Sequence, residues 1–372
     1  MIWKKPRNIY KKKIIFLTDN IFTKRDYQRY GIFYLNKHFK IKIFTLNKIY
    51  LKSKYIYFFN NYSKLKEKIK NEKANYLIDL MYPSIKSFLI KRFCKSKNIK
   101  LIKLSLSTYP VEKISYFQRL FNLFNKKKKH GGNILVKLKN RLIIKLNSII
   151  KYDYHFIDSQ INRPKNKFCK VIQNHSFDYD IFLLNKKKTK KKLIVFLDSN
   201  VISHNDYNVH FTKSPVNREN YIREINEYLA YIEKIFKQKV IVAANPKSKL
   251  HEIKKIFRNR KVLINNSFNL IKNAKIVFAH KSTAVSFVTC LNKSIVFLTS
   301  NELNESWYGD QIKYQAKLLG SQIINISSAK KEPFLNIIKI NKRKYKKYIY
   351  NYIKIPKTKN KYNWEIFKEQ LV

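Results

Sequence analysis

The polar residues best placed to do chemistry follow a short apolar stretch, Lys275–Ala279, which is expected to form a buried strand. His280, Ser282 and Thr283 come directly after it, and a helix is expected to begin at once. Serine and threonine at such a start cap free backbone N–H groups. The same N–H groups, with the positive end of the helix dipole, can bind a pyrophosphate. We therefore expect these three residues to bind the phosphates of a nucleotide, with a plain helix cap as the simpler interpretation.

Two further groups of polar residues follow predicted strands: Asn245, Lys247 and Ser248 after Val240–Ala244, and Asp198 and His204 after Leu193–Leu197. The carboxyl ends of parallel strands meet at one edge of a sheet, where α/β proteins bind their ligands. We expect the first group to share the phosphate site with His280. The second group can bind a ligand or act as acid or base. At Asn245-Pro246, an ordinary turn is the alternative.

The first half of the chain carries two more polar motifs. Arg25, Asp26 and Arg29 lie in the stretch RDYQRYG, shortly after a predicted strand that is followed by Asp19. Arginine can donate two parallel hydrogen bonds to a phosphate or carboxylate group. Either aspartate could take up a proton, although Asp26 could instead pair with an arginine or with the start of a helix. His175 lies in the stretch HSFDYD, which could line a cleft or could simply form a hinge turn.

The elements that must position these residues alternate along the chain. Helical patterns are clearest at Lys64–Lys70, Ile85–Lys97, Arg218–Lys237 and Thr283–Leu291. Short runs rich in Ile, Val and Phe are expected to be strands buried on both faces. They are Ile14–Leu17, Ile41–Leu46, Tyr76–Leu80, Ile99–Leu106, Tyr154–Ile157, Leu193–Leu197, Val240–Ala244, Lys261–Ile264, Lys275–Ala279 and Ser294–Leu298. Strands that alternate with helices predict α/β structure, with two Rossmann-like, doubly wound parallel-sheet domains facing a cleft.

The composition changes at residues 185–192, NKKKTKKK, which contain no apolar side chain and are expected to link the domains. The first domain is then 1–184, the second 193–328, and 329–372 form a helical tail of a length to cross back onto the first domain. Within the first domain, 114–150 are an insertion that fits two basic amphipathic helices with a glycine break. This insertion is expected either to pack as a helical hairpin or to lie on anionic lipid.

The net charge of +57 comes from 80 lysines and arginines against 23 acidic residues. The excess is mostly lysine and is spread along the chain, together with heavy use of Ile, Asn, Tyr and Phe, as an AT-rich genome would produce. It favours attraction to phosphates in general. A nucleic-acid-binding protein is disfavoured, because neither arginine clusters nor a reading motif is present.

Cysteine usage and hydropathy bear on the compartment. Cys94, Cys169 and Cys290 are far apart, so neither a zinc site nor a disulfide framework is indicated, and a reducing compartment is expected. No signal peptide and no transmembrane run is indicated. We expect a cytoplasmic protein that at most contacts the inner face of the plasma membrane from its surface.

Taken together, these motifs resemble the uncharacterised GT-B-type glycosyltransferase-like proteins of bacterial surface-polysaccharide clusters, related in pattern to capsule and sialic-acid transferases. The matching stretches, over about residues 14–300, are RDYQRYG at Arg25–Gly31, HSFDYD at His175–Asp180, FLD at Phe196–Asp198 with HNDY at His204–Tyr207, and HKSTA at His280–Ala284. Where that pattern has His-Pro, this chain has Asn245-Pro246, and an amide can still donate to phosphate but carries no charge.

The resemblance implies transfer of a sugar from a nucleotide-activated donor to a surface polysaccharide or a lipid-linked glycan. The donor would lie against the residues around His280 and Asn245, and the acceptor against Arg25, Arg29, His175, Asp198 and His204. Asp26 or Asp19 would be the general base. No cofactor and no metal are expected, since no Asp-x-Asp follows a strand. The alternatives are a CDP-polyol phosphotransferase on the same fold and an inactive GT-B scaffold.

Overall fold

The structure is a computed structural model that describes residues 11–47, 53–112, 134–164, 169–185, 192–203, 207, 213–246, 248–328 and 339–371, without the side chains of 134–137. These residues form two compact units. Unit 1 contains the described parts of Met1–Leu106, Leu135–Phe177 and Lys357–Val372, and unit 2 contains those of Ser107–Ile134 and Asp178–Pro356. Each unit has one parallel sheet with helices, which confirms the predicted α/β class with two Rossmann-like domains.

Unit 1 is built on a seven-stranded parallel sheet in the order β3-β2-β1-β4-β5-β6-β7. The strands are β1 Lys13–Thr18, β2 Lys40–Thr45, β3 Ile56–Phe58, β4 Tyr76–Asp79, β5 Lys100–Ser105, β6 Tyr154–Ile157 and β7 Lys170–Gln173. The inner strand β1 is buried from Ile14 to Thr18, because its side chains alternate between the two covered faces of the sheet. The strand order reverses between β1 and β4, as in a doubly wound fold.

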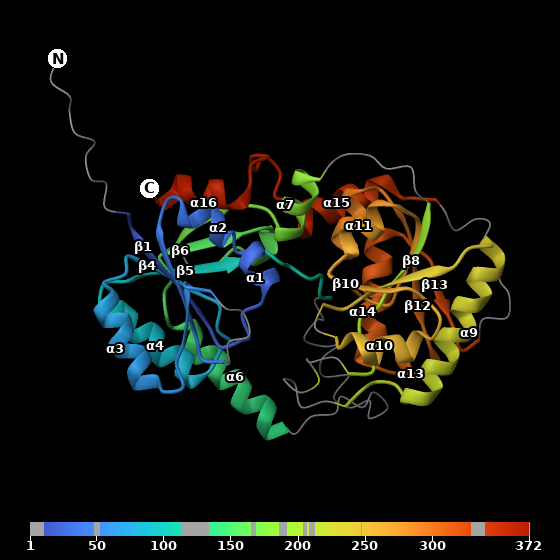
Figure 1. Cartoon of the computed structure of the whole chain (residues 1–372), viewed down its shortest axis with the longest axis horizontal. Coiled ribbons are helices and arrows are strands. Elements are labelled where there is room, and N and C mark those ends of the chain that lie inside the picture. The colour runs from blue at the N-terminus through green and yellow to red at the C-terminus, as the bar shows by residue number, and fades with distance from the viewer. Residues whose placement is uncertain are drawn as a thin grey trace, which may run out of the picture. The chain divides into compact units, whose positions relative to one another are not determined.

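Helices cover both faces of this sheet. They are α1 Lys24–Arg29, α2 Ile32–Asn36, α3 Tyr62–Glu72, α4 Ile85–Ser96, α6 Ile134–Ser148 and α16 Asn363–Leu371, with a short 3₁₀ turn at Gln160–Asn162. Apolar residues of α2 and α16 pack on one face and those of α3 and α4 on the other, as Figure 1 shows. Of the predicted basic insertion 114–150, residues 114–133 lie outside the described residues, and the described part contains α6.

The C-terminal helix α16 belongs to unit 1, whereas the preceding tail helix belongs to unit 2. Trp364 is buried against Phe16 and Phe177, and its indole N–H donates to the carbonyl of Arg29 at 3.0 Å. The indole also lies so close to Gly31, which has a φ of +55°, that a Cβ there would meet it at 2.2 Å. The glycine of RDYQRYG is therefore required by packing and backbone conformation.

Unit 2 repeats the plan with a six-stranded parallel sheet in the order β10-β9-β8-β11-β12-β13. The strands are β8 Leu193–Leu197, β9 Val240–Ala244, β10 Val262–Ile264, β11 Ala274–Ala279, β12 Ser294–Thr299 and β13 Ile323–Asn325. The helices are α7 Phe177–Leu184, α9 Arg218–Phe236, α10 Leu250–Phe257, α11 Ser267–Lys272, α12 Val285–Cys290, α13 Asn301–Asn304, α14 Trp307–Leu319 and α15 Lys342–Tyr352. The contacts divide the chain after Phe177, upstream of the lysine-rich stretch that marked the predicted boundary.

Local sequence explains why the helices of unit 2 begin where they do. The side chain of Asn217 accepts from the N–H groups of Glu219 and Asn220 at the start of α9, and Ser306 does the same for α14. In contrast, α12 has only six residues, and its N-cap Ala284 provides no side-chain cap. The predicted helix at Thr283–Leu291 is thus shorter than expected, and its dipole is correspondingly small.

Candidate functional site

The predicted phosphate-binding residues lie at the carboxyl edge of the unit 2 sheet. Asp198 follows β8, Asn245 follows β9 and His280 follows β11, and these three strands are neighbours. The register pairs Leu197 with both Ala243 and Ala279, so the three loops leave the sheet at the same level. Lys247 and His204 lie outside the described residues.

His280 is a core residue. Its side chain has no exposed surface, its Nδ1 donates to the carbonyl of Leu298 at 2.8 Å, and its Nε2 accepts from the hydroxyl of Tyr221 at 2.8 Å. Burial lowers the pKa of His280 to about 4, so the ring is neutral. The sequence analysis placed His280 in contact with the donor, but both ring nitrogens are already bonded within the core. Its part is to fix the end of β11 against β12.

Asp198 is also buried, and it ties two loops together. Its carboxylate accepts from the backbone N–H of Asn200 at 2.9 Å. Burial raises the pKa of Asp198 to about 6, and the backbone N–H groups of Asn200 and Asn245 oppose that shift. The side chain thus holds the turns after β8 and β9, rather than standing in open solvent as expected for an acceptor-binding group.

The loop after β11 is held from the side by Gln315 of α14. The amide of this fully buried side chain accepts from the N–H of Ser282 at 3.3 Å and donates to its carbonyl at 3.1 Å. The hydroxyl of Ser282 accepts from the N–H of Ala284 at 3.1 Å. The hydroxyl of Ser282 is therefore used within the loop, as in the simpler interpretation of a local cap, and its N–H is used by Gln315 of α14.

Thr283, in contrast, is exposed, and within the described part of the chain its hydroxyl and its N–H have no hydrogen-bond partner. Asn245 is half-buried, and its carbonyl accepts from the N–H of Ser248 at 3.0 Å in a turn. The hydroxyl oxygen of Ser248 is buried without a partner among the described residues. Of the predicted donor contacts, Thr283 and Ser248 are thus the ones that have polar groups without a partner among the described residues.

Lys281 was missed by the sequence analysis although it stands inside the motif. Its ammonium lies 4.6 Å from the ring centroid of Trp307, 4.4 Å from that of Tyr308 and 5.8 Å from that of Tyr109, and it donates to Gln311 at 2.6 Å. Aromatic faces and an amide oxygen hold a cation without neutralising it. The carbonyl of Lys281 also accepts from the hydroxyl of Ser199 at 2.6 Å. This half-buried positive charge belongs to the same strand-end loop as Thr283.

In unit 1, the two candidate bases have different surroundings. Asp26 completes a capping box with Thr23, whose N–H and hydroxyl donate to its carboxylate at 3.0 and 2.6 Å. Asp19 is half-buried directly after β1, accepts from the N–H of Tyr82 at 3.1 Å, and has its pKa raised by burial. A raised pKa suits a carboxylate that must take a proton near neutral pH. Of the two, Asp19 has the better surroundings for a base.

The remaining predicted residues of unit 1 are His175, Arg29 and Arg25, and the first of them has a structural role. His175 is fully buried, with its Nε2 donating to the carbonyl of Lys361 at 2.8 Å, so it anchors the returning C-terminal segment instead of lining an open surface. The guanidinium of Arg29 lies 4.6 Å from the ring centroid of Phe177. Arg25 is exposed on α1.

Two polar clusters of unit 1 gave no signal in the sequence. Lys91 of α4 forms a buried ion pair with Asp79 at 3.2 Å, and Tyr152 donates to the same carboxylate at 2.5 Å. The ring of His155 lies 2.8 Å from the hydroxyl of Ser105, and burial lowers its pKa to about 4. These residues are far apart in sequence, and only the sheet register brings them together.

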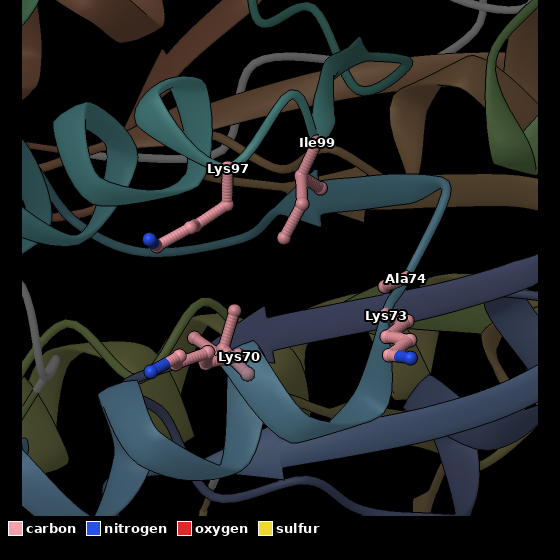
Figure 2. Close-up of a pocket in the computed structure, with 6 residues that line it drawn as sticks. Lys70, Lys73, Ala74, Lys97 and Ile99 are labelled. Atoms are coloured by element: carbon pink, nitrogen blue, oxygen red, sulfur yellow. The ribbon is translucent and has the colours of Figure 1, made fainter.

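A pocket at the opposite edge of the unit 1 sheet is lined by Ile69, Lys70, Lys73, Ala74, Lys97 and Ile99 (Figure 2). Its lysines lie at the carboxyl ends of α3 and α4, where cations are favourable to the helix dipole. Figure 2 shows Lys70 and Lys97 pointing to one side and Lys73 to the other, so the three ammonium groups do not converge. The pocket therefore has an ordinary structural explanation and contains none of the candidate catalytic residues.

Within the described ranges, no group of three or more His, Cys, Asp or Glu side chains is arranged to hold a metal ion. In the same part of the chain, every helix is too short or too polar to cross a bilayer.

Comparison with known proteins shows the fold. No protein-family model matches the chain, and no curated protein sequence does. Among solved structures, the wall teichoic acid polymerase TagF, as its H444N variant, matches with a TM-score of 0.55 and 10% identity over 96% of this chain and 88% of that chain. UDP-GlcNAc 2-epimerase from Methanocaldococcus jannaschii matches with a TM-score of 0.47 and 13% identity over 96% and 98%. MurG from Acinetobacter baumannii matches with a TM-score of 0.41 and 6% identity over 85% and 86%. At such identities the likeness to TagF concerns architecture only, and the two lower scores add no argument. The predicted GT-B-type fold is confirmed.

Proposed function

We propose that the chain is a glycosyltransferase that moves a sugar from a nucleotide-activated donor to a surface polysaccharide or a lipid-linked glycan. The observation that carries the proposal is the loop after β11 at the edge of the unit 2 sheet. This loop carries both the caged cation of Lys281 and the hydroxyl and N–H of Thr283, which have no partner among the described residues. A departing nucleotide phosphate needs such fixed positive charge and hydrogen-bond donors. The surrounding loops are braced by Asp198, His280 and Gln315, so the site is pre-formed.

Each residue then has a defined part. Lys281 and Thr283 contact the phosphates, and the turn at Asn245 contacts the rest of the nucleotide. Asp19 of unit 1 takes the proton of the acceptor hydroxyl, because burial raises its pKa toward the working range of a base. Since the phosphate charge is met by a lysine and by N–H and O–H donors, the proposed step needs no metal or cofactor.

The first test is a thermal-shift screen of the full chain against UDP-, GDP-, CMP- and CDP-linked compounds. A donor that binds only the folded protein raises Tm by mass action, by an amount equivalent to about 2.7 kcal/mol at a hundredfold excess over Kd. We expect one nucleotide class to give a shift that Thr283→Ala abolishes without lowering the Tm of the free protein. A shift that survives in this variant would remove the proposed site, and the absence of any shift would favour an inactive scaffold.

A second candidate function is the transfer of a polyol phosphate from a CDP-linked donor. The observation that favours it is the fold shared with TagF, a wall teichoic acid polymerase. Product analysis separates the two reactions. Glycosyl transfer from a nucleoside-diphosphate sugar releases the diphosphate, whereas polyol phosphate transfer releases CMP and moves phosphorus to the acceptor. Release of CMP without transfer of phosphorus would indicate a CMP-linked sugar donor.

A further inference from the structure

Helix α6 of unit 1 turns apolar side chains toward solvent. Leu138 and Leu142 are 49% and 68% exposed, and Ile149, just after the helix, is 64% exposed. Their spacing of four and seven residues places them along one side of the helix. Asn147, in contrast, is buried and faces the body of the unit. Helices of globular proteins normally turn such a stripe inward, so its outward direction requires an explanation.

Helix α4 adds a second apolar stripe beside the first. The amide of Asn147 donates to the carbonyl of Ser84 at 3.0 Å, which places α6 against the start of α4. Ile85 and Leu89, in the first two turns of α4, are 55% and 42% exposed. Because α6 contacts the start of α4, we treat the exposed apolar residues of both helices as one surface and call it the α4–α6 face: Ile85, Leu89, Leu138, Leu142 and Ile149.

The charged residues of the two helices have one sign. Neither helix contains an acidic residue. The nearby carboxylates of Asp79 and Asp153 are paired with Lys91 and Lys95. The exposed cations of the two helices are Lys86, Arg92, Lys139, Arg141 and Lys145.

We propose that the α4–α6 face docks on the surface of an anionic phospholipid membrane. Apolar side chains of this size can enter the boundary between headgroups and acyl chains, while lysine and arginine reach the lipid phosphates. A bilayer supplies both chemistries at once, which matches an apolar stripe bordered only by cations. The proposal deepens the proposed function, because a lipid-linked acceptor would lie at such a surface. The test of membrane docking uses no nucleotide donor, so the docking proposal and the proposed function can fail separately.

The test must separate docking from the general attraction of a chain with a net charge of +57. We would measure co-sedimentation of the full chain with phosphatidylcholine vesicles, with and without phosphatidylglycerol, at low and high salt. High salt screens the charge attraction but not apolar insertion. The variant Leu138→Ser with Leu142→Ser leaves the charge unchanged. We expect the wild type to keep binding phosphatidylglycerol vesicles at high salt, and the variant to partition at least about 10-fold more weakly.

A matched control is Phe33→Ser with Ile235→Ser, which removes two exposed apolar side chains elsewhere at the same net charge. This control should bind as the wild type does. Equal loss in both double variants, or no loss in the first, would overturn the proposal. A large fall in Tm of the Leu138→Ser, Leu142→Ser variant would also overturn it, because it would show that protein covers this face.

Discussion

The buried histidine of unit 2 makes the stability of that unit depend on pH. The pKa of His280 is lowered by burial from 6.5 to about 4, so the unfolded chain takes up a proton at a pH where the folded chain does not. The contribution of His280 to the free energy of unfolding is therefore complete above pH 6.5 and is lost as the pH falls toward 4. Linkage gives a loss of about 2 kcal/mol between about pH 7 and about pH 5 for a pKa difference of this size.

The assay is native-state hydrogen exchange with mass spectrometry, because it reports opening of β11 and β12 separately from unit 1. In the wild type the opening free energy of these strands should fall by less than the amount given above, because burial raises the pKa of Asp198 in the same unit to about 6 and its protonation offsets part of the loss. His280→Phe should be less stable at neutral pH, because the hydroxyl of Tyr221 and the carbonyl of Leu298 lose their partner. It should, however, lack the part of the loss that His280 contributes, so the change in opening free energy between the two pH values should differ from that of the wild type by about 2 kcal/mol.

A matched control is His251→Phe, which removes an exposed histidine of α10 in the same unit. It should keep the full pH-dependent loss in β11 and β12. If wild type and His280→Phe lost the same free energy between the two pH values, the neutral, core-bound state of His280 would be refuted.

Three further predictions concern unit 1. Trp364→Ala should destabilise the unit by about 3–5 kcal/mol through lost packing, seen as a lower urea midpoint, whereas an effect below about 1 kcal/mol would mean that α16 does not contribute to the core. Lys91→Met should cost about 3–5 kcal/mol near neutral pH, because it leaves Asp79 buried without its cation, and an unchanged midpoint would contradict a buried pair. Once a donor is identified, Asp19→Asn should abolish turnover without changing donor affinity, whereas Asp26→Asn should mainly cost about 1 kcal/mol of stability through its cap. Loss of turnover only in the Asp26 variant would reverse the assignment of the base.

Most strands could be predicted from the sequence because parallel strands buried on both faces form continuous apolar runs. Tyr154–Ile157, Leu193–Leu197 and Val240–Ala244 have the bounds that were expected. The missed strands β3, β7 and β13 are only three or four residues long. They pair on one side only, at the sheet edges, so their sequences need not be fully apolar.

The site was harder to predict because burial is decided by distant parts of the chain. Nothing next to His280 in sequence indicates that Tyr221 and the carbonyl of Leu298 take both of its nitrogens. Likewise, Trp307 and Tyr109 come from different segments, so the aromatic cage of Lys281 is visible only in three dimensions. Sequence position alone indicates which loop lies at the strand edge but not which of its side chains are buried.

The central claim is that the phosphates of the donor bind beside Lys281 at the edge of the unit 2 sheet. Isothermal titration of the nucleotide that gives a thermal shift tests it most directly, with wild type, Lys281→Met and Lys275→Met. Lys275 is the second residue of the same strand, near the opposite edge of the sheet, so its variant removes an equal charge away from the site. We predict a Kd about 10-fold or more weaker for Lys281→Met, from the loss of one charge-assisted contact, and an unchanged Kd for Lys275→Met. Equal affinities for Lys281→Met and the wild type would contradict the account.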